Sequence, residues 1–403
     1  MTTMTLTKIR GCRLSLAALA LLAGASVSPA QTPVAGASAL GRVVVRNDSA
    51  LPRKGEVVQI AIGALGAGLK PADLARVHVT DAAGKDLMVQ PMDLTGDHED
   101  EAIAFQADVA AKASAEFKLS LGAKRSLSLD DFKVYGRFVR ERFDDFAWEN
   151  DKVAFRMYGE ALETWEKEPL TSSSVDAWVK KTPRLMVDEW YLVDDYHKDH
   201  GEGGDFYPAG KTRGCGGTGL LEGGKLYTSK NFRKSRLLSR GPIRLLFELE
   251  YEAWDVAGVK VRETKRVTLD AGSNFSRFET LYSTEGGAPL ASSVQYAIGD
   301  KKEKGADVRI DAKAGVVRTW EELNRYNKDG FMGCAVVVDP KDLIATSELD
   351  GNVLVALRRP SPFFAGTGWD RSGDFKGMAD FDAYVDAFAA KSSSPLKVEV
   401  VSR

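Results

Sequence analysis

An excess of one charge is what this chain most plainly lacks. Its 403 residues carry 55 lysines and arginines against 57 acidic residues, a formal net charge of −2. The basic residues are spread among the acids, without the basic stripe that binding to a phosphate backbone requires. The composition therefore argues against a nucleic-acid partner.

Long apolar runs are absent after residue 30. The run LSLAALALLAGASV follows a short basic start and precedes Ser28-Pro29-Ala30, the pattern of a secretory signal peptide over residues 1–30. Its apolar core is shorter than the roughly 20 residues of a spanning helix, and no later stretch approaches that length. We therefore expect no membrane span and an exported protein, periplasmic or secreted.

Cysteine is rare, with three in the whole sequence, and Cys12 falls in the predicted signal peptide. The mature chain would keep Cys215 and Cys334, two thiols in an oxidising compartment. Each is either a small apolar filler or half of one structural disulfide, and the sequence leaves both alternatives open. A reactive thiol is the less favoured interpretation.

β-Strand patterns fill most of the remaining chain, about 370 residues, which is more than one small core usually organises. Residues 31–41 are small and rich in proline, glycine and serine, and predict a flexible lead-in. Short strand-like runs then predict a small N-terminal β module over 42–125. Longer alternating runs predict a second domain over 126–403, so that the fold class is all-β with a large antiparallel sandwich.

One segment departs from the β pattern near the C-terminus. In GDFKGMADFDAYVDAFAAK, apolar residues recur at steps of three and four, which predicts a short amphipathic helix. We expect its aromatic stripe to pack on the sheet.

The segment DDYHKDHGEGGDFYPAGKTRGCGG, residues 194–217, is too rich in glycine for a helix interior and too polar for a strand. It predicts a loop, and loops of this length in a compact domain are usually functional or disordered. The aromatic residues in and before it argue against disorder. We therefore expect a folded, functional loop.

Two of the four histidines, His197 and His200, lie in this loop among several carboxylates. Imidazole exchanges protons near neutral pH, so the predicted catalytic residues are His197 and His200, with Glu202 as an acid and Tyr207 as a second proton carrier. Such a set can serve mutarotation, epimerisation or β-elimination of a sugar, because each reaction removes one proton and donates another.

A metal site is the alternative use of the same loop. His197, His200, Glu202 and Asp205 include ligand types that zinc accepts, and the carboxylates alone could hold calcium. The H-x-x-H spacing in a loop lacks the helical geometry that makes H-E-x-x-H specific. No cofactor is therefore expected, and zinc or calcium stays the alternative.

Arg156 leads a second group of residues, which we expect to bind the substrate. It lies in a predicted strand, turn, strand over 141–163, on the face opposite Val153, Phe155 and Met157. Its guanidinium could clamp a carboxylate, or could form a structural salt bridge with a nearby acid. The predicted substrate-binding residues are Arg156, Tyr158, Lys211, Arg213, Asp205, Trp148 and Trp190, and their positive charge favours an anionic sugar.

Several long motifs resemble one known family. The runs DDFAWENDKVAFRMYGEALE, DAWVKKTPRLMVDEWY, YHKDHGEGGDFYPAGKTRGCGG, GPIRLLFELEYEAW and GDFKGMADFDAYVDAFA occur in the order typical of the domain of unknown function 4861 family. That family is similar to the galactose mutarotase-like superfamily, which implies a β-supersandwich with a concave sugar-binding face and work on carbohydrate. In aldose epimerases of that superfamily two histidines and an acid transfer protons. His197, His200 and Glu202 lie closer together in sequence than that pattern has them, which argues against a simple mutarotase.

Together these features favour an exported carbohydrate-active enzyme that acts on uronic-acid oligosaccharides by proton abstraction and donation, as a lyase or an epimerase. One alternative is a glycoside hydrolase, for which Asp195, Glu202, Asp205, Glu149 and Glu163 could supply a carboxylate pair. The other is a periplasmic oligosaccharide-binding protein without catalysis.

Overall fold

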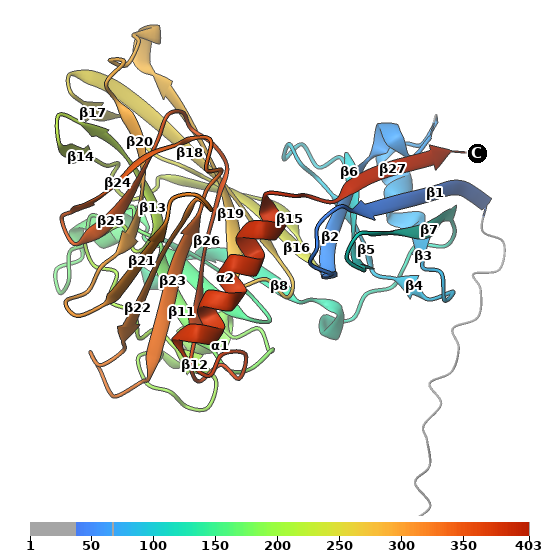
Figure 1. The fold of residues 1–403 in the computed structure, drawn as a ribbon, viewed down its shortest axis with the longest axis horizontal. Coiled ribbons are helices and arrows are strands. Elements are labelled where there is room, and N and C mark those ends of the chain that lie inside the picture. Colours follow the sequence, from blue (N-terminus) through green and yellow to red (C-terminus); the bar gives the residue numbers. More distant parts are fainter. Residues whose placement is uncertain (1–37, 67, 403) are drawn as a thin grey trace, which may run out of the picture. The chain divides into compact units, whose positions relative to one another are not determined.

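The computed structural model describes residues 38–66 and 68–402 and consists mainly of antiparallel sheets (Figure 1). The predicted all-β class is confirmed. The predicted signal peptide and most of the lead-in lie outside the described residues, while residues 38–41 of that lead-in begin the first strand. Neither α-helix in the described ranges is long and apolar enough to cross a bilayer.

The N-terminal strands form two small sheets around a core of their own. The strands are β1 (Ser38–Asn47), β2 (Arg53–Ala61), β3 (Val77–Thr80), β4 (Asp86–Leu87), β5 (Val89–Met92), β6 (Ala102–Val109), β7 (Ala113–Leu121) and β27 (Lys397–Ser402). One sheet has the order β27-β1-β7-β3-β4 and the other β2-β6-β5. Val43, Val45, Phe105 and Phe117 are buried between them. The last strand thus joins the first, although we had assigned its residues to the 126–403 domain.

The sheet that carries the candidate site has the order β12-β11-β10-β9-β8. Its strands are β8 (Val134–Val139), β9 (Asp145–Asn150), β10 (Val153–Met157), β11 (Asp176–Lys180) and β12 (Gly203–Gly204). Every residue of β9, β10 and β11 is buried. We call this the β10 sheet.

Two further sheets complete the larger part of the chain. The first has the order β14-β13-β20-β25-β24, and comprises β13 (Cys215–Glu222), β14 (Lys225–Tyr227), β20 (Gln295–Lys301), β24 (Leu343–Leu349) and β25 (Asn352–Leu357). The second is nine-stranded, and comprises β15 (Lys234–Arg240), β16 (Arg244–Glu250), β17 (Trp254–Val256), β18 (Val259–Asp270), β19 (Phe275–Thr284), β21 (Asp307–Asp311), β22 (Val316–Glu322), β23 (Phe331–Val337) and β26 (Phe363–Trp369). One core joins the inner faces of the three sheets.

Two α-helices cover sheet faces. Helix α2 (Met378–Ser392) confirms the predicted amphipathic helix, because its Phe381 and Val385 are buried against Phe275 and Trp320 of the nine-stranded sheet (Figure 1). Helix α1 (Val187–Val193) was not predicted. It packs Trp190 and Tyr191 on the face of the β10 sheet that points away from the main core. Both faces of the β10 sheet are therefore buried.

Candidate functional site

The loop over residues 194–217 is folded, as expected, because backbone hydrogen bonds attach it to β11. Gly203 and Gly204 form β12, which pairs with Lys180 and Val179. Further along, Gly214 forms a parallel bridge with Val175, and the Cys215 N–H donates to the Val175 carbonyl at 2.9 Å. Gly214 has a φ of +60°, and a Cβ there would lie 2.0 Å from the Val175 oxygen. Only glycine allows this close approach.

Aromatic packing holds the start of the loop on the β10 sheet. Tyr196 is buried and stacks on Trp178 of β11, with ring centroids 4.9 Å apart. Tyr191 of α1 contacts both rings edge-on or tilted. Because Tyr196 is fixed, the next residue, His197, has a defined position.

His197 is half-buried, with 40% of its side chain exposed. Its Nδ1 lies 2.8 Å from the carbonyl oxygen of Asp205, and a carbonyl can only accept, so Nδ1 carries the hydrogen. Burial lowers the pKa of His197, which favours the neutral ring. In that tautomer Nε2 keeps a free lone pair, and no partner for Nε2 is found among the described residues. The geometry is that of a general base.

Five charged residues lie behind His197 and form what we call the Arg156 cluster: Arg142, Asp145, Arg156, Asp176 and Asp205. Arg156 and Asp176 are direct partners across β10 and β11, so their side chains share the face under α1. The Arg156 Nη2 donates to Asp176 at 2.6 Å and to Asp205 at 2.8 Å. Asp205 thereby connects the cluster to His197, whose Nδ1 lies 3.7 Å from its Oδ2.

The Arg156 cluster holds two arginines against three carboxylates. Burial, opposed by Arg156 and Arg142, raises the pKa of Asp145 to about 7. Burial and the neighbouring Asp176 also raise the pKa of Asp205 well above its ordinary range. Burial opposes the charge on Arg156, but Asp176 and Asp205 outweigh it and raise its pKa. The cluster can therefore hold a buried proton close to the His197 ring.

Unpartnered polar atoms mark the same cluster. Buried atoms without a hydrogen-bond partner include Arg156 Nη1, Asp145 Oδ2, Asp176 Oδ1 and Tyr191 Oη. Buried polar groups are nearly always satisfied, so such a concentration is typical of a functional site or of internal water.

Other predicted catalytic residues are placed differently. His200 is exposed and its Nε2 lies 2.9 Å from an Asp195 carboxylate oxygen, a surface pair away from the Arg156 cluster. Glu202 is half-buried, and its carbonyl accepts from the Lys181 N–H. Tyr207 is buried in the main core, beneath the Lys301 ammonium, which lies 4.5 Å from its ring centroid. The structure therefore brings one histidine, not two, to the cluster.

The predicted substrate-binding residues are mostly buried. Arg156 is 4% exposed, its guanidinium donates to Asp176 and Asp205, and its Nε lies 3.8 Å from Asp145. Its alternative as a structural ion pair therefore fits, and Asp145 is the sequence neighbour among its partners. Arg213 is buried and donates to Ser173 and Thr218. Three aromatic residues of the set are buried as well, namely Trp148, Trp190 and Tyr158. Lys211 is exposed. A sugar on the outer surface would contact Lys211 alone of this set.

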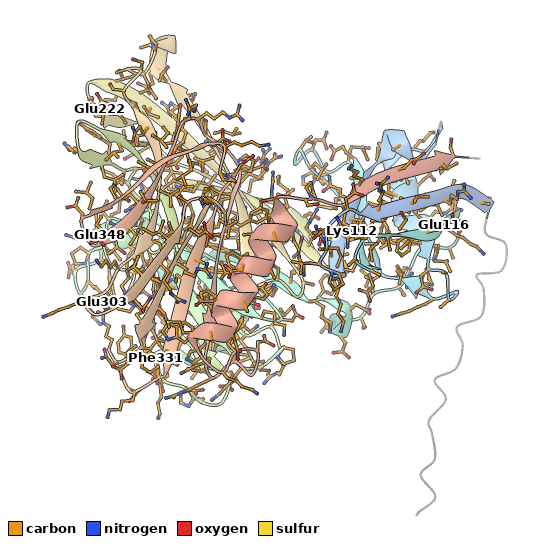
Figure 2. All side chains as sticks on the ribbon, viewed as in Figure 1. Lys112, Glu116, Glu222, Glu303, Phe331 and Glu348 are labelled. Carbon is orange, nitrogen blue, oxygen red and sulfur yellow. The ribbon has the colours of Figure 1, made fainter. Side chains whose placement is uncertain are left out.

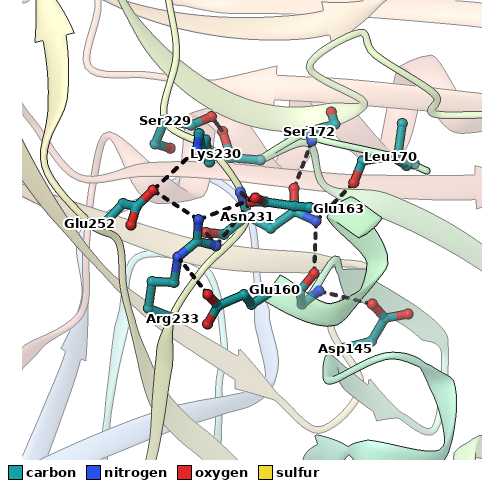
Figure 3. Close-up of polar contacts among 12 residues, drawn as sticks. Asp145, Glu160, Glu163, Leu170, Ser172, Ser229, Lys230, Asn231, Arg233 and Glu252 are labelled. Atoms are coloured by element: carbon teal, nitrogen blue, oxygen red, sulfur yellow. Dashed lines mark hydrogen bonds and ion pairs between the residues drawn. The ribbon is translucent and has the colours of Figure 1, made fainter. Parts of the chain in front are cut away.

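The carboxylates considered for hydrolysis are largely engaged in structural contacts. Glu163 receives Arg233 at 2.9 Å and the Asn231 N–H at 3.0 Å, and Figure 3 shows these bonds holding together the 159–172 and 229–233 segments. Glu149 is fully buried and accepts from Lys180 at 2.5 Å and from the Val187 N–H at 2.6 Å. These two acids therefore stabilise the fold by connecting separate segments of the chain.

The alternative metal site is not assembled in the loop. His197, His200, Glu202 and Asp205 do not form a cluster of close ligand atoms within residues 38–66 and 68–402. Asp93, Asp97 and Glu101 do form one there. Their turn explains the grouping, because Asp93 accepts from the Gly96 and His98 N–H groups and Glu101 from the Leu94 N–H.

An aromatic residue that the sequence reasoning missed completes the site. Tyr326, in the loop between β22 and β23, is 40% exposed and stacks on His197 with ring centroids 4.3 Å apart. Arg325 lies 5.3 Å from the Tyr326 centroid. The only hint in the sequence is a lone tyrosine in the polar turn NRYNKDG. His197, Tyr326 and Arg325 form what we call the outer triad.

The outer triad lies outside three cavities of about 500, 430 and 720 Å³, whose linings include no residue of the loop. One further ion pair lies close to Arg325. Glu303, labelled in Figure 2, is half exposed and lies 3.2 Å from the Lys301 ammonium. The candidate site is therefore best described as a surface site over a buried charged cluster.

Comparison with known proteins finds a relative across nearly the whole chain. It is 31% identical to "Uncharacterized protein P7" of Formosa agariphila over 388 residues, which covers 89% of this chain and 93% of the relative. Two solved structures from Enterococcus faecalis also match, an α-mannosidase at 13% identity and a glycosyl hydrolase family 38 protein at 12%, each with a TM-score of 0.48.

Those two matches cover 90% of this chain but only 46% and 47% of the solved chains, so this chain spans about half their length. A family model described as "Domain of unknown function (DUF4861)" matches residues 45–398. The chain is a member of the DUF4861 family, as its motifs indicated.

Proposed function

We propose that this chain is an exported carbohydrate-active enzyme that removes a proton from a uronic-acid oligosaccharide, with His197 as the general base. The observation that carries the proposal is the His197 ring, whose Nδ1 is held by the Asp205 carbonyl and whose Nε2 is free. A β-elimination or an epimerisation both begin with loss of the C–H proton beside the uronate carboxylate.

Tyr326 and Arg325 take over the binding roles first assigned to buried residues. Tyr326 offers an exposed face for a sugar ring, and its contact with His197 would place that ring beside Nε2. Arg325 is exposed and lies 5.3 Å from the ring centroid of the same tyrosine. It could therefore neutralise the carboxylate of a uronate bound on Tyr326. Neutralising the carboxylate makes the adjacent C–H more acidic, so a base of modest strength suffices.

The Arg156 cluster supports the base from behind. Asp205 orients Nδ1 through its carbonyl, and its carboxylate can stabilise the imidazolium that forms after proton transfer. Because Tyr207 lies in the core, the same imidazolium is the proposed donor to the leaving oxygen. We also propose that the chain belongs to the galactose mutarotase-like superfamily, whose members bind sugars on a concave face.

The test compares two histidines of one loop. His197→Gln should reduce kcat/KM by about 10²- to 10⁴-fold on the oligouronide that the protein turns over, the usual contribution of a general base. His200→Gln is the matched control and should stay within about twofold of wild type, since its ring pairs only with exposed Asp195. Full activity of folded His197→Gln would refute the assignment.

The pH profile supplies a second readout of the same proposal. A base is lost when it is protonated, so kcat/KM should fall as pH drops through the His197 pKa. Because burial lowers that pKa, the fall should be centred below the ordinary histidine value of about 6.5. A fall centred well above that value would identify another group as the base.

A non-catalytic oligosaccharide-binding protein is the second candidate. It is favoured by the surface position of the outer triad, outside the three cavities described. In that case wild type should bind an oligouronide in isothermal titration, and no product should be found in the titration samples when they are analysed afterwards.

A further inference from the structure

Cys215 and Cys334 lie far apart in the sequence but on facing strands of the main core. Cys215 is the first residue of β13, and Cys334 lies in the middle of β23, in the nine-stranded sheet. Their exposed fractions are 0% and 2%, and both belong to the core that joins the inner faces of the sheets.

The start of β13 is seated directly on β26. Gly216 has a φ of +93°, and a Cβ at this position would lie 2.4 Å from the Cβ of Ala365. Beside it, the Cys215 thiol donates to the Gly366 carbonyl at 3.3 Å. Glycine at 216 thus allows an approach that brings the Cys215 sulfur to the inner surface of β26.

The pairing register of β23 and β26 brings Cys334 to the same place. Cys334 is opposite Thr367 and Ala335 is opposite Gly366. Because side chains alternate along a strand, Cys334 points inward with Val336, while Ala335 points outward to the core under α2. Cys334 and Cys215 therefore lie in the same part of the buried core, and both thiols are free in this structure.

We propose that Cys215 and Cys334 are joined by a disulfide when the protein folds under oxidising conditions. The two S–H bonds break and one Sγ–Sγ bond forms, which releases two protons and two electrons. The electrons reduce a disulfide oxidant, such as glutathione disulfide, to two thiols through a mixed disulfide. Because both sulfurs are inaccessible in the folded state, this oxidation accompanies folding. The bond links the β13 sheet to the nine-stranded sheet.

The experiment uses the full chain, unfolded and reduced, then refolded with glutathione disulfide and glutathione. After refolding, the protein is denatured in guanidinium with an alkylating reagent, digested with trypsin without reduction and analysed by mass spectrometry. We expect the peptides 214–225 and 329–341 to appear as one cross-linked species that separates on reduction. The same species is expected from protein exported to an oxidising compartment.

Cys334→Ser is the matched control, since serine keeps the size of the side chain but cannot pair. In that variant residue 215 should be found alkylated, and the midpoint of thermal unfolding should no longer depend on reductant. In wild type, reductant should lower that midpoint by several degrees. Refolded wild-type protein with both residues alkylated, and with no cross-linked peptide, would overturn the proposal.

Discussion

Arg156 supports the position of the His197 ring through Asp205. Its guanidinium joins Asp176 on β11 to Asp205, and the carbonyl of Asp205 holds the ring. An arginine in this position balances buried carboxylates that would otherwise repel one another.

Replacing Arg156 by methionine should destabilise the protein by about 3–5 kcal/mol, because it leaves buried carboxylates without their cation. The measurement is the free energy of unfolding in urea. Arg184→Met is the control, since Arg184 pairs with Glu189 at the surface and its loss should cost at most about 1 kcal/mol. Equal stability of the two variants would show that the Arg156 cluster does not hold the fold.

Sequence reasoning at this scale singled out a loop that is folded, but it placed several residues on the surface that the structure buries. The alternation around Arg156 correctly separated it from Val153 and Phe155, but alternation alone cannot show that the second face is also covered. Helix α1, which covers it, follows Pro183 in a short stretch without a long periodic pattern. Trp190 and Tyr158 are therefore core residues, and the partly exposed aromatic residue that stacks on His197 is Tyr326, from the loop between β22 and β23.

At the scale of elements, the loop over 194–217 depends on glycines of two kinds. Gly203 and Gly214 face the backbone of β11 or its flank, where a Cβ would lie 2.1 Å and 2.0 Å from a carbonyl oxygen. Gly210 also has a positive φ, of +53°, but has open space around it. Gly203 and Gly214 are needed because a side chain would collide with the neighbouring backbone. Gly210 is needed only because its backbone has a left-handed conformation.

Gly214→Ala should therefore destabilise the protein by about 2–4 kcal/mol, from the backbone clash added to the left-handed conformation. Gly210→Ala should cost only about 1 kcal/mol, since it bears the conformational term alone. Thermal unfolding followed by circular dichroism would compare them. If Gly210→Ala proved the more damaging, the attachment of the loop to β11 would be incorrectly described.

Strand patterns were the most reliable part of the sequence at this scale. The alternating runs around residues 244–250 and 259–270 form β16 and β18, and the helical period near the C-terminus forms α2. Short strands such as β12 and β14 carry too few residues for any period. The β12 strand forms because β11 offers it a free edge, which is a tertiary cause. The β14 strand forms because the turn at Gly223 and Gly224 folds it back onto β13, which is a local cause.

For the whole molecule, strand patterns were enough to predict an all-β protein, and the resemblance of several long motifs indicated its family. They could not predict that β27 returns to pair with β1, because such pairing depends on where the chain ends meet and not on local pattern. Nor could it be predicted which charged residues lie inside, since Glu263 and Lys265 lie between Val261 and Val267 on the buried side of β18.

Three buried lysine–glutamate pairs can be compared with the Arg156 cluster. Lys265 with Glu263, Lys180 with Glu149 and Lys301 with Glu321 are nearly inaccessible, like the Arg156 cluster. The Arg156 cluster differs from them in one respect, because through Asp205 it contacts a titratable ring that reaches the surface. For this reason we assign the chemistry to His197.

The most direct test of that assignment is to incubate the purified protein with a panel of polyuronide oligosaccharides. Mass spectrometry and near-ultraviolet absorbance would be recorded together. Proton NMR would distinguish an epimer from unchanged substrate, since the two have the same mass. Our account predicts, for at least one oligouronide, either cleavage without gain of water and with a new near-ultraviolet chromophore, or an epimer of unchanged mass with new NMR signals. Cleavage with gain of water and no chromophore, or no change in any member of the panel, would contradict it.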